Sequence, residues 1–182
     1  MPGLEDRMKV RMLVLVVGLV FGVMISVADA KGPESAVHLF AGQTADAAAD
    51  ALAEVALLQA GGGTWERIVV GRVYYLSGRK DRGRAIFDAI LADKPEPSDW
   101  IRIGRVYYEG GDWAEAKKMF EKVLEKKPKD ADWLAEIGAY FNLQGDRQRA
   151  EELFARSFAK ESKNDRNTAM AAGSYVGVVP KR

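Results

Sequence analysis

Hydrophobic residues in the stretch 64–163 recur at three- and four-residue steps, the spacing of one face of an α-helix. Residues 100–107 form the clearest such helix, and the glycines at 110–111 end it, because glycine adopts the left-handed conformation without steric cost. A second amphipathic stretch follows, with Asp112 placed to cap it and Pro128 placed to stop it. The pattern therefore predicts two helices joined by a glycine turn.

The same pair of helices is predicted three times. Residues 71–75 read Gly-Arg-Val-Tyr-Tyr, and the same residue types recur 33 positions later at 104–108. Phe87 and Phe120 share this offset, and Phe154 follows at an offset of 34. Because unrelated positions stay in phase, the chain is predicted to be an array of repeats whose large side chains fill the interfaces between units. The predicted repeats are 64–97, 98–130 and 131–163.

Helical segments are predicted on both sides of the array. Residues 31–63 contain an alanine-rich helix over 45–60, and they form an N-terminal cap or a degenerate repeat. Residues 164–182 are predicted to form a C-terminal capping helix and a tail. An acidic stripe on the helix over 45–60 is either a solvated face or a partner for nearby arginines: Asp46, Asp50 and Glu54.

The repeat resembles the tetratricopeptide repeat family. The motif of that family has a first-turn Trp, an apolar–Gly pair, an aromatic residue, then Ala, Phe and a closing Pro. The second repeat matches throughout, at Trp100, Ile103, Gly104, Tyr107, Ala116, Phe120 and Pro128. The first repeat departs from the motif at Arg67 and Gly83, and the third departs at Leu134 and Ser162. The resemblance implies an all-α, right-handed superhelix (solenoid) of three helix-turn-helix repeats with helical caps at both ends.

The family uses the first helix of each repeat to line a concave binding groove. Arg72 and Tyr75 of the first repeat recur as Arg105 and Tyr108, and arginine offers a planar fork for carboxylates. We therefore expect a protein or peptide partner with an acidic or carboxylate-bearing segment, unless Glu109 or the acidic stripe pairs with these arginines. The predicted groove residues are Trp65, Ile68, Arg72, Tyr75, Ile101, Arg102, Arg105, Tyr108 and Asn142.

The first 30 residues have the features of an export signal. Basic residues at 7–11 precede the uncharged, apolar run 12–28, and Ala28 and Ala30 have the size and spacing of a cleavage site. We expect residues 1–30 to be a signal peptide and the rest to reach the periplasm or be secreted, without membrane insertion. The alternative is an uncleaved inner-membrane signal anchor with the repeats outside the cytoplasm, although a span usually needs roughly 20 residues.

Composition argues against most catalytic and nucleic-acid functions. The chain has no Cys and one histidine, His38, so thiolate chemistry is excluded and a zinc site would depend on one residue. Lys and Arg number 27 against 26 Asp and Glu, which gives no basic surplus for nucleic acid. We expect no catalytic residue, metal or cofactor. The predicted function is a non-enzymatic adaptor of the cell envelope. The alternative is a scaffold or accessory subunit of an envelope assembly, secretion, pilus or polysaccharide export machine, which would use its outer surfaces or end helices. The sequence leaves open whether the protein forms oligomers.

Overall fold

The computed structural model describes residues 37–180 of the 182-residue chain. The chain divides into two compact units, Met1–Leu52 and Ala53–Arg182. The described part of the first unit contains a 3₁₀ turn at 37–39 and the start of helix α2 (Ala45–Ala60). The predicted signal peptide lies outside the described residues.

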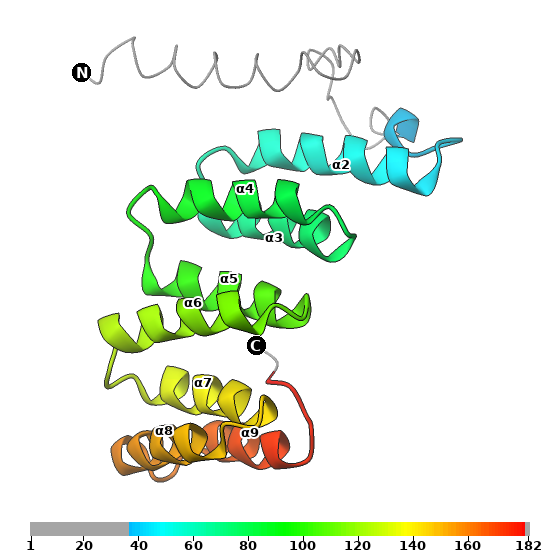
Figure 1. Ribbon diagram of the computed structural model, residues 1–182. Coiled ribbons are helices and arrows are strands. Elements are labelled where there is room, and N and C mark those ends of the chain that lie inside the picture. The colour runs from blue at the N-terminus through cyan, green and yellow to red at the C-terminus, as the bar shows by residue number, and fades with distance from the viewer. Residues whose placement is uncertain (1–36, 181–182) are drawn as a thin grey trace, which may run out of the picture. The chain divides into compact units, whose positions relative to one another are not determined.

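The second unit is a stack of helix pairs (Figure 1). The first helices of the pairs are α3 (Thr64–Leu76), α5 (Pro97–Glu109) and α7 (Ala131–Leu143). The second helices are α4 (Lys80–Leu91), α6 (Trp113–Lys126) and α8 (Arg147–Lys160), and α9 (Asp165–Tyr175) follows them. No strand occurs among residues 37–180, so the predicted all-α solenoid is confirmed.

One glycine makes the turn inside each pair. Gly78, Gly111 and Gly145 have φ angles of 89°, 77° and 85°, which other residues adopt only with strain. Each of these glycines comes two residues after the end of a first helix. The glycine turns predicted from the sequence are therefore present in all three pairs.

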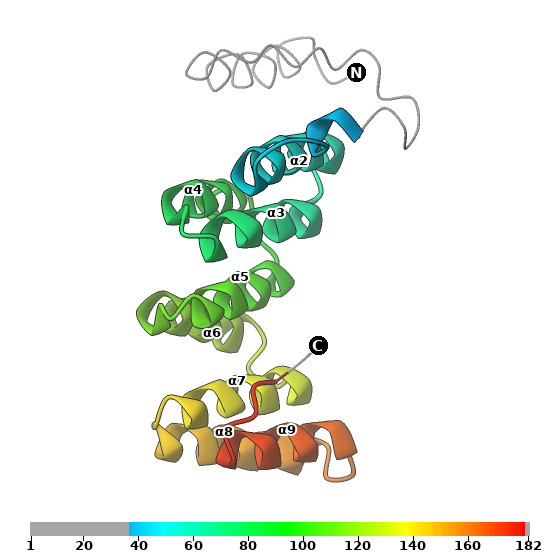
Figure 2. The ribbon, with the colours of Figure 1, turned by 90° about the vertical axis from the view of Figure 1, so that its right-hand side faces the viewer.

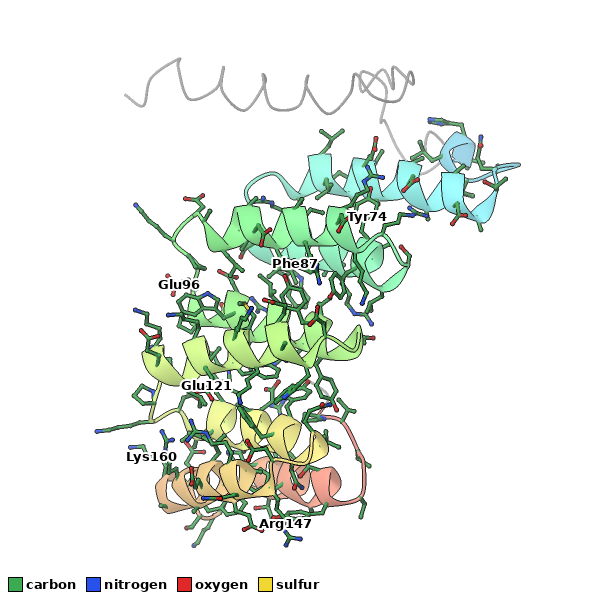
Figure 3. The ribbon with its side chains drawn as sticks, viewed as in Figure 1. Tyr74, Phe87, Glu96, Glu121, Arg147 and Lys160 are labelled. Carbon is green, nitrogen blue, oxygen red and sulfur yellow. The ribbon has the colours of Figure 1, made fainter. Side chains whose placement is uncertain are left out.

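A second glycine and a phenylalanine hold the two helices of each pair together. Gly104 of α5 faces Phe120 of α6, and a Cβ atom on Gly104 would lie 2.6 Å from the Cε1 atom of that ring. The fully buried Phe87 also reaches the following pair, where its ring centroid lies 5.6 Å from that of Tyr107 (Figure 3). Phe154 faces Gly138 in the same way. The aromatic side chains thus fill the interfaces that the repeat pattern assigns to them.

The start of α6 differs from the prediction. Asp112 is the N-cap residue, but its side chain makes no cap hydrogen bond. The Asp112 carboxylate instead accepts hydrogen bonds from Tyr75 Oη at 3.2 Å and from Arg84 Nη2 at 2.8 Å. A contact with the preceding pair has replaced the local cap, which a reading of one helix at a time does not detect.

Within the part of the chain that the structure describes, no helix has both the length and the apolar character that crossing a membrane requires.

Candidate functional site

The first helices α3, α5 and α7 carry the predicted groove residues, and three of these residues are buried. Ile68, Tyr75 and Ile101 lie in the hydrophobic core. The Tyr75 ring packs edge-on against that of Tyr107, with 5.2 Å between centroids. The prediction that these three residues line an open groove is wrong, because the stack uses them to fill the interface between the first and second pairs.

Arg72 and Arg105, which were predicted to bind a partner, instead form ion pairs with carboxylates of the following helix pair. Arg72 Nε donates to Glu109 Oε2 at 2.8 Å, and Arg72 Nη2 forms an ion pair with the other carboxylate oxygen. Arg105 donates from Nε and Nη2 to the two carboxylate oxygens of Glu136, at 2.6 and 2.9 Å. The prediction that a partner engages these two forks is therefore wrong. The alternative in which Glu109 pairs with one of them is confirmed.

The two ion pairs differ in burial and therefore in strength. The Arg72 and Glu109 side chains are half-exposed, and such pairs contribute about 0–1 kcal/mol. Glu136 is fully buried, and Arg105 is 26% exposed. Burial disfavours the charged guanidinium, but the hydrogen bonds and the attraction to Glu136 outweigh it and raise the pKa of Arg105. Arg105 is thus a structural link between α5 and α7.

Two further groove residues make contacts between helices: Tyr108 of α5 contacts α7, and Asn142 of α7 contacts α9. The Tyr108 ring lies 4.7 Å from that of Tyr140. Asn142 Nδ2 donates to Ser174 Oγ at 2.9 Å. Both residues are half-buried, so they stabilise the stack more than they present free surface.

Trp65 and Arg102 form the open part of the predicted groove. Trp65 is 51% exposed, and the guanidinium carbon of Arg102 lies 4.7 Å from the centroid of the indole ring. Arg102 has no carboxylate partner among residues 37–180, unlike Arg72 and Arg105. A guanidinium stacked on an indole is held in place while its N–H groups stay available to a carboxylate.

An exposed valine extends this surface along α3. Val69 follows Trp65 by one helical turn and is exposed, so the two side chains lie on the same side of α3. We call Trp65, Val69 and Arg102 the platform. The sequence prediction missed Val69, although an apolar residue four positions after Trp65, itself a predicted groove residue, is expected on the same side of the helix.

The described residues offer no sign of a metal centre. Residues 37–180 contain no group of three or more His, Asp or Glu side chains that could together hold a metal ion, and His38 is exposed.

The stacked helix pairs and their shared glycine and phenylalanine positions define a helical repeat protein. The sequence model of the family described as "Tetratricopeptide repeat" matches residues 101–164, from α5 to the end of α8. Residues 101–164 are therefore a segment of tetratricopeptide repeats, a fold that generally mediates contacts between proteins. No curated protein sequence matches the chain.

Proposed function

We propose that this protein is a non-enzymatic adaptor of the cell envelope that holds a segment of another protein on the platform. The observation that carries the proposal is the stacked guanidinium of Arg102, which is fixed on Trp65 and has no carboxylate partner within the described chain. The envelope location rests on the basic lead, apolar run and Ala28-Asp29-Ala30 sequence of the first 30 residues.

The chemistry of the platform defines the partner segment. An apolar side chain packs on Trp65 and Val69, and a neighbouring carboxylate accepts hydrogen bonds from Arg102. A charged hydrogen bond of this kind contributes about 1.5–3 kcal/mol where water is excluded, and less where it is exposed. The segment is therefore acidic next to an apolar residue, or it ends in a carboxylate after one.

Selection from a displayed peptide library tests this assignment when the charge of Arg102 on the protein is reversed. The wild-type protein should enrich peptides with a carboxylate beside an apolar residue. Arg102→Glu should instead enrich peptides with Lys or Arg at that position. Lys129→Glu, which makes the same change of charge on the exposed loop between α6 and α7, should leave the selected peptides unchanged. Identical peptides selected by wild-type and Arg102→Glu proteins would show that the platform is not the binding site.

A further inference from the structure

A pocket lies between the second and third helix pairs, away from the platform. The loops that join successive pairs run along one edge of the second unit, and the glycine turns lie along the opposite edge (Figures 1 and 2). The pocket, of about 280 Å³, lies at the loop edge, where Figure 3 shows Lys160. Its lining comes from the loop before α7, the start of α7 and the end of α8: Pro128, Lys129, Leu134, Arg156, Ala159 and Lys160. Three of these residues are cations and none is a carboxylate, so we call it the basic pocket.

The Arg156 guanidinium is held at the basic pocket by the loop. Arg156 Nη2 donates to the Pro128 carbonyl oxygen at 2.7 Å. A guanidinium has five N–H donors, so the other donors of Arg156 stay available. Arg156 has no carboxylate partner among residues 37–180.

Arg156 differs in this respect from the other arginines of the second helices α4, α6 and α8. Each of those arginines pairs with at least one carboxylate: Arg82 with Glu54, Arg84 with Asp112, Arg147 with Glu151, and Arg149 with Glu121 and Glu152. The first of these pairs also shows that Glu54 of the acidic stripe neutralises a nearby arginine. The chain thus supplies counter-ions for the other arginines on these helices and supplies none for Arg156.

The equivalent positions of α6 show the same contrast. Glu125 pairs with Lys122 at 3.0 Å and with Lys126 at 3.8 Å. Helix α8 begins 34 residues after α6, and at this offset the three residues correspond to Arg156, Ala159 and Lys160. An alanine therefore stands where α6 has the carboxylate, and the two cations of α8 lack the counter-ion that their equivalents have.

The carboxylates that follow the other two cations in the sequence are engaged elsewhere. Asp130, next to Lys129, accepts a hydrogen bond from a backbone N–H of α7 at 3.0 Å. Glu161, next to Lys160, accepts from Asn164 Nδ2 at 2.8 Å. Neither Lys129 nor Lys160 has a carboxylate partner within the described part of the chain.

Helix geometry alone does not account for the three cations. Arg156 and Lys160 are one helical turn apart, a spacing at which like charges repel. The helix dipole favours Lys160 in the last turn of α8, but this effect falls off within that turn and does not extend to Arg156 or to Lys129. An anion between the three side chains would relieve their repulsion.

We propose that the basic pocket binds a phosphate group. A phosphate monoester carries about −1.5 to −2 charges at neutral pH and has three acceptor oxygens, so it can accept hydrogen bonds from all three cations. A carboxylate has one charge and two oxygens, and it would leave a cation unpaired. The guanidinium of Arg156 matches two phosphate oxygens at once, while the two lysines contribute point charges.

The size and floor of the pocket limit what the phosphate is attached to. A volume of about 280 Å³ lies just below the roughly 300–1,000 Å³ of sites for drug-sized ligands, so the ligand is one phosphate group with a small fragment. Leu134 and Ala159 give that fragment an apolar contact. Inorganic phosphate, a small phosphate ester and the headgroup of phosphatidic acid share this chemistry.

Isothermal titration calorimetry of the purified protein with inorganic phosphate tests the proposal. The wild-type protein should bind one phosphate per chain. Arg156→Gln and Lys160→Gln should each weaken binding about two- to fivefold, because each removes one exposed charged contact. Ala159→Glu gives α8 the carboxylate that Glu125 provides in α6, so it should weaken binding at least about tenfold by pairing with both cations.

Lys122→Gln is the matched control. It removes the same single charge at the corresponding position of α6, where Glu125 already pairs with the lysine, so it should keep the wild-type affinity for phosphate. All four substitutions change exposed side chains, and the melting temperatures should stay close to that of the wild type.

Vesicles distinguish the two sources of the phosphate group. Retention of the wild-type protein, but not of Ala159→Glu, on phosphatidylcholine vesicles that contain phosphatidic acid would assign the pocket to a lipid headgroup. Binding of inorganic phosphate without such retention would assign it to a soluble phosphate. Vesicles of phosphatidylcholine alone should retain neither protein.

Three results would overturn the proposal. The first is the absence of binding to both inorganic phosphate and phosphatidic acid vesicles. The second is equal weakening by Lys122→Gln and Arg156→Gln, which would indicate a general attraction to positive charge. The third is undiminished binding by Ala159→Glu.

The basic pocket and the platform can be tested separately. Lys129→Glu should weaken phosphate binding and leave the selected peptides unchanged, whereas Arg102→Glu should change the selected peptides and leave phosphate binding as in the wild type. Failure of either proposal therefore leaves the other to its own test.

Discussion

Removal of Arg105 should destabilise the fold far more than removal of Arg72, although both arginines occupy the same position in successive repeats. Arg105→Ala leaves Glu136 fully buried without its bidentate partner. Removing one partner of a buried ion pair costs about 3–5 kcal/mol, because the remaining charge loses a charge-assisted, bidentate contact in the interior. Arg72→Ala leaves Glu109 half-exposed to water, and the expected cost is about 0–1 kcal/mol.

Urea denaturation followed by far-UV circular dichroism measures both changes. A loss of about 3–5 kcal/mol is a large part of the roughly 5–15 kcal/mol that stabilises a domain, so the Arg105→Ala midpoint should fall clearly. The double variant Arg105→Met/Glu136→Leu removes both charges together, and it should be more stable than Arg105→Ala.

Equal losses for Arg72→Ala and Arg105→Ala would refute this reasoning. So would a double variant that is less stable than Arg105→Ala. Either result would mean that Glu136 is not held as a buried charge by Arg105, and Arg105 would again be a candidate for binding a partner.

Three further predictions concern the core, the response to acid and export. Phe120→Ala should cost about 3–5 kcal/mol, because the ring is fully buried against Gly104, and a melting shift too small to resolve would contradict the repeat register. Although burial opposes it, the hydrogen bonds that the Asp112 carboxylate accepts from Tyr75 and Arg84 lower the pKa of Asp112. This contribution to stability is present above the unfolded pKa of about 3.9, and it is lost as the pH falls through the lowered pKa of the folded state. Asp112→Asn should therefore flatten the dependence of the melting temperature on pH below about pH 4. N-terminal sequencing of envelope-fractionated protein should begin at Lys31, whereas an intact leader on membrane-bound protein would favour the anchor.

The helices and the contacts inside each pair could be predicted from the sequence, because they depend on local spacing. Gly111 and its equivalents mark the turns, and Gly104 and Phe120 mark the packing of one helix on the other. These residue types recur at a fixed period, so the residue type that each position of the repeat requires is seen several times in one chain.

The state of the groove residues could not be predicted in the same way, because it depends on side chains from two repeats. Arg72 and Arg105 have equivalent sequence contexts, yet one pairs with Glu109 and the other with Glu136, across 37 and 31 residues. Arg102 has the same charge but stacks on Trp65 instead. A repeat pattern places these arginines on one side of the helix but does not show which carboxylates come within reach.

The binding affinity of one peptide tests the central claim most directly. The peptide selected by the wild-type protein, labelled and titrated by fluorescence anisotropy, should bind Arg102→Gln at least about tenfold more weakly, which corresponds to the loss of one charged hydrogen bond. It should bind Arg72→Gln with wild-type affinity, because Arg72 is already paired with Glu109. The opposite result, an unchanged affinity for Arg102→Gln and a lost affinity for Arg72→Gln, would contradict the account and assign binding to the paired arginine.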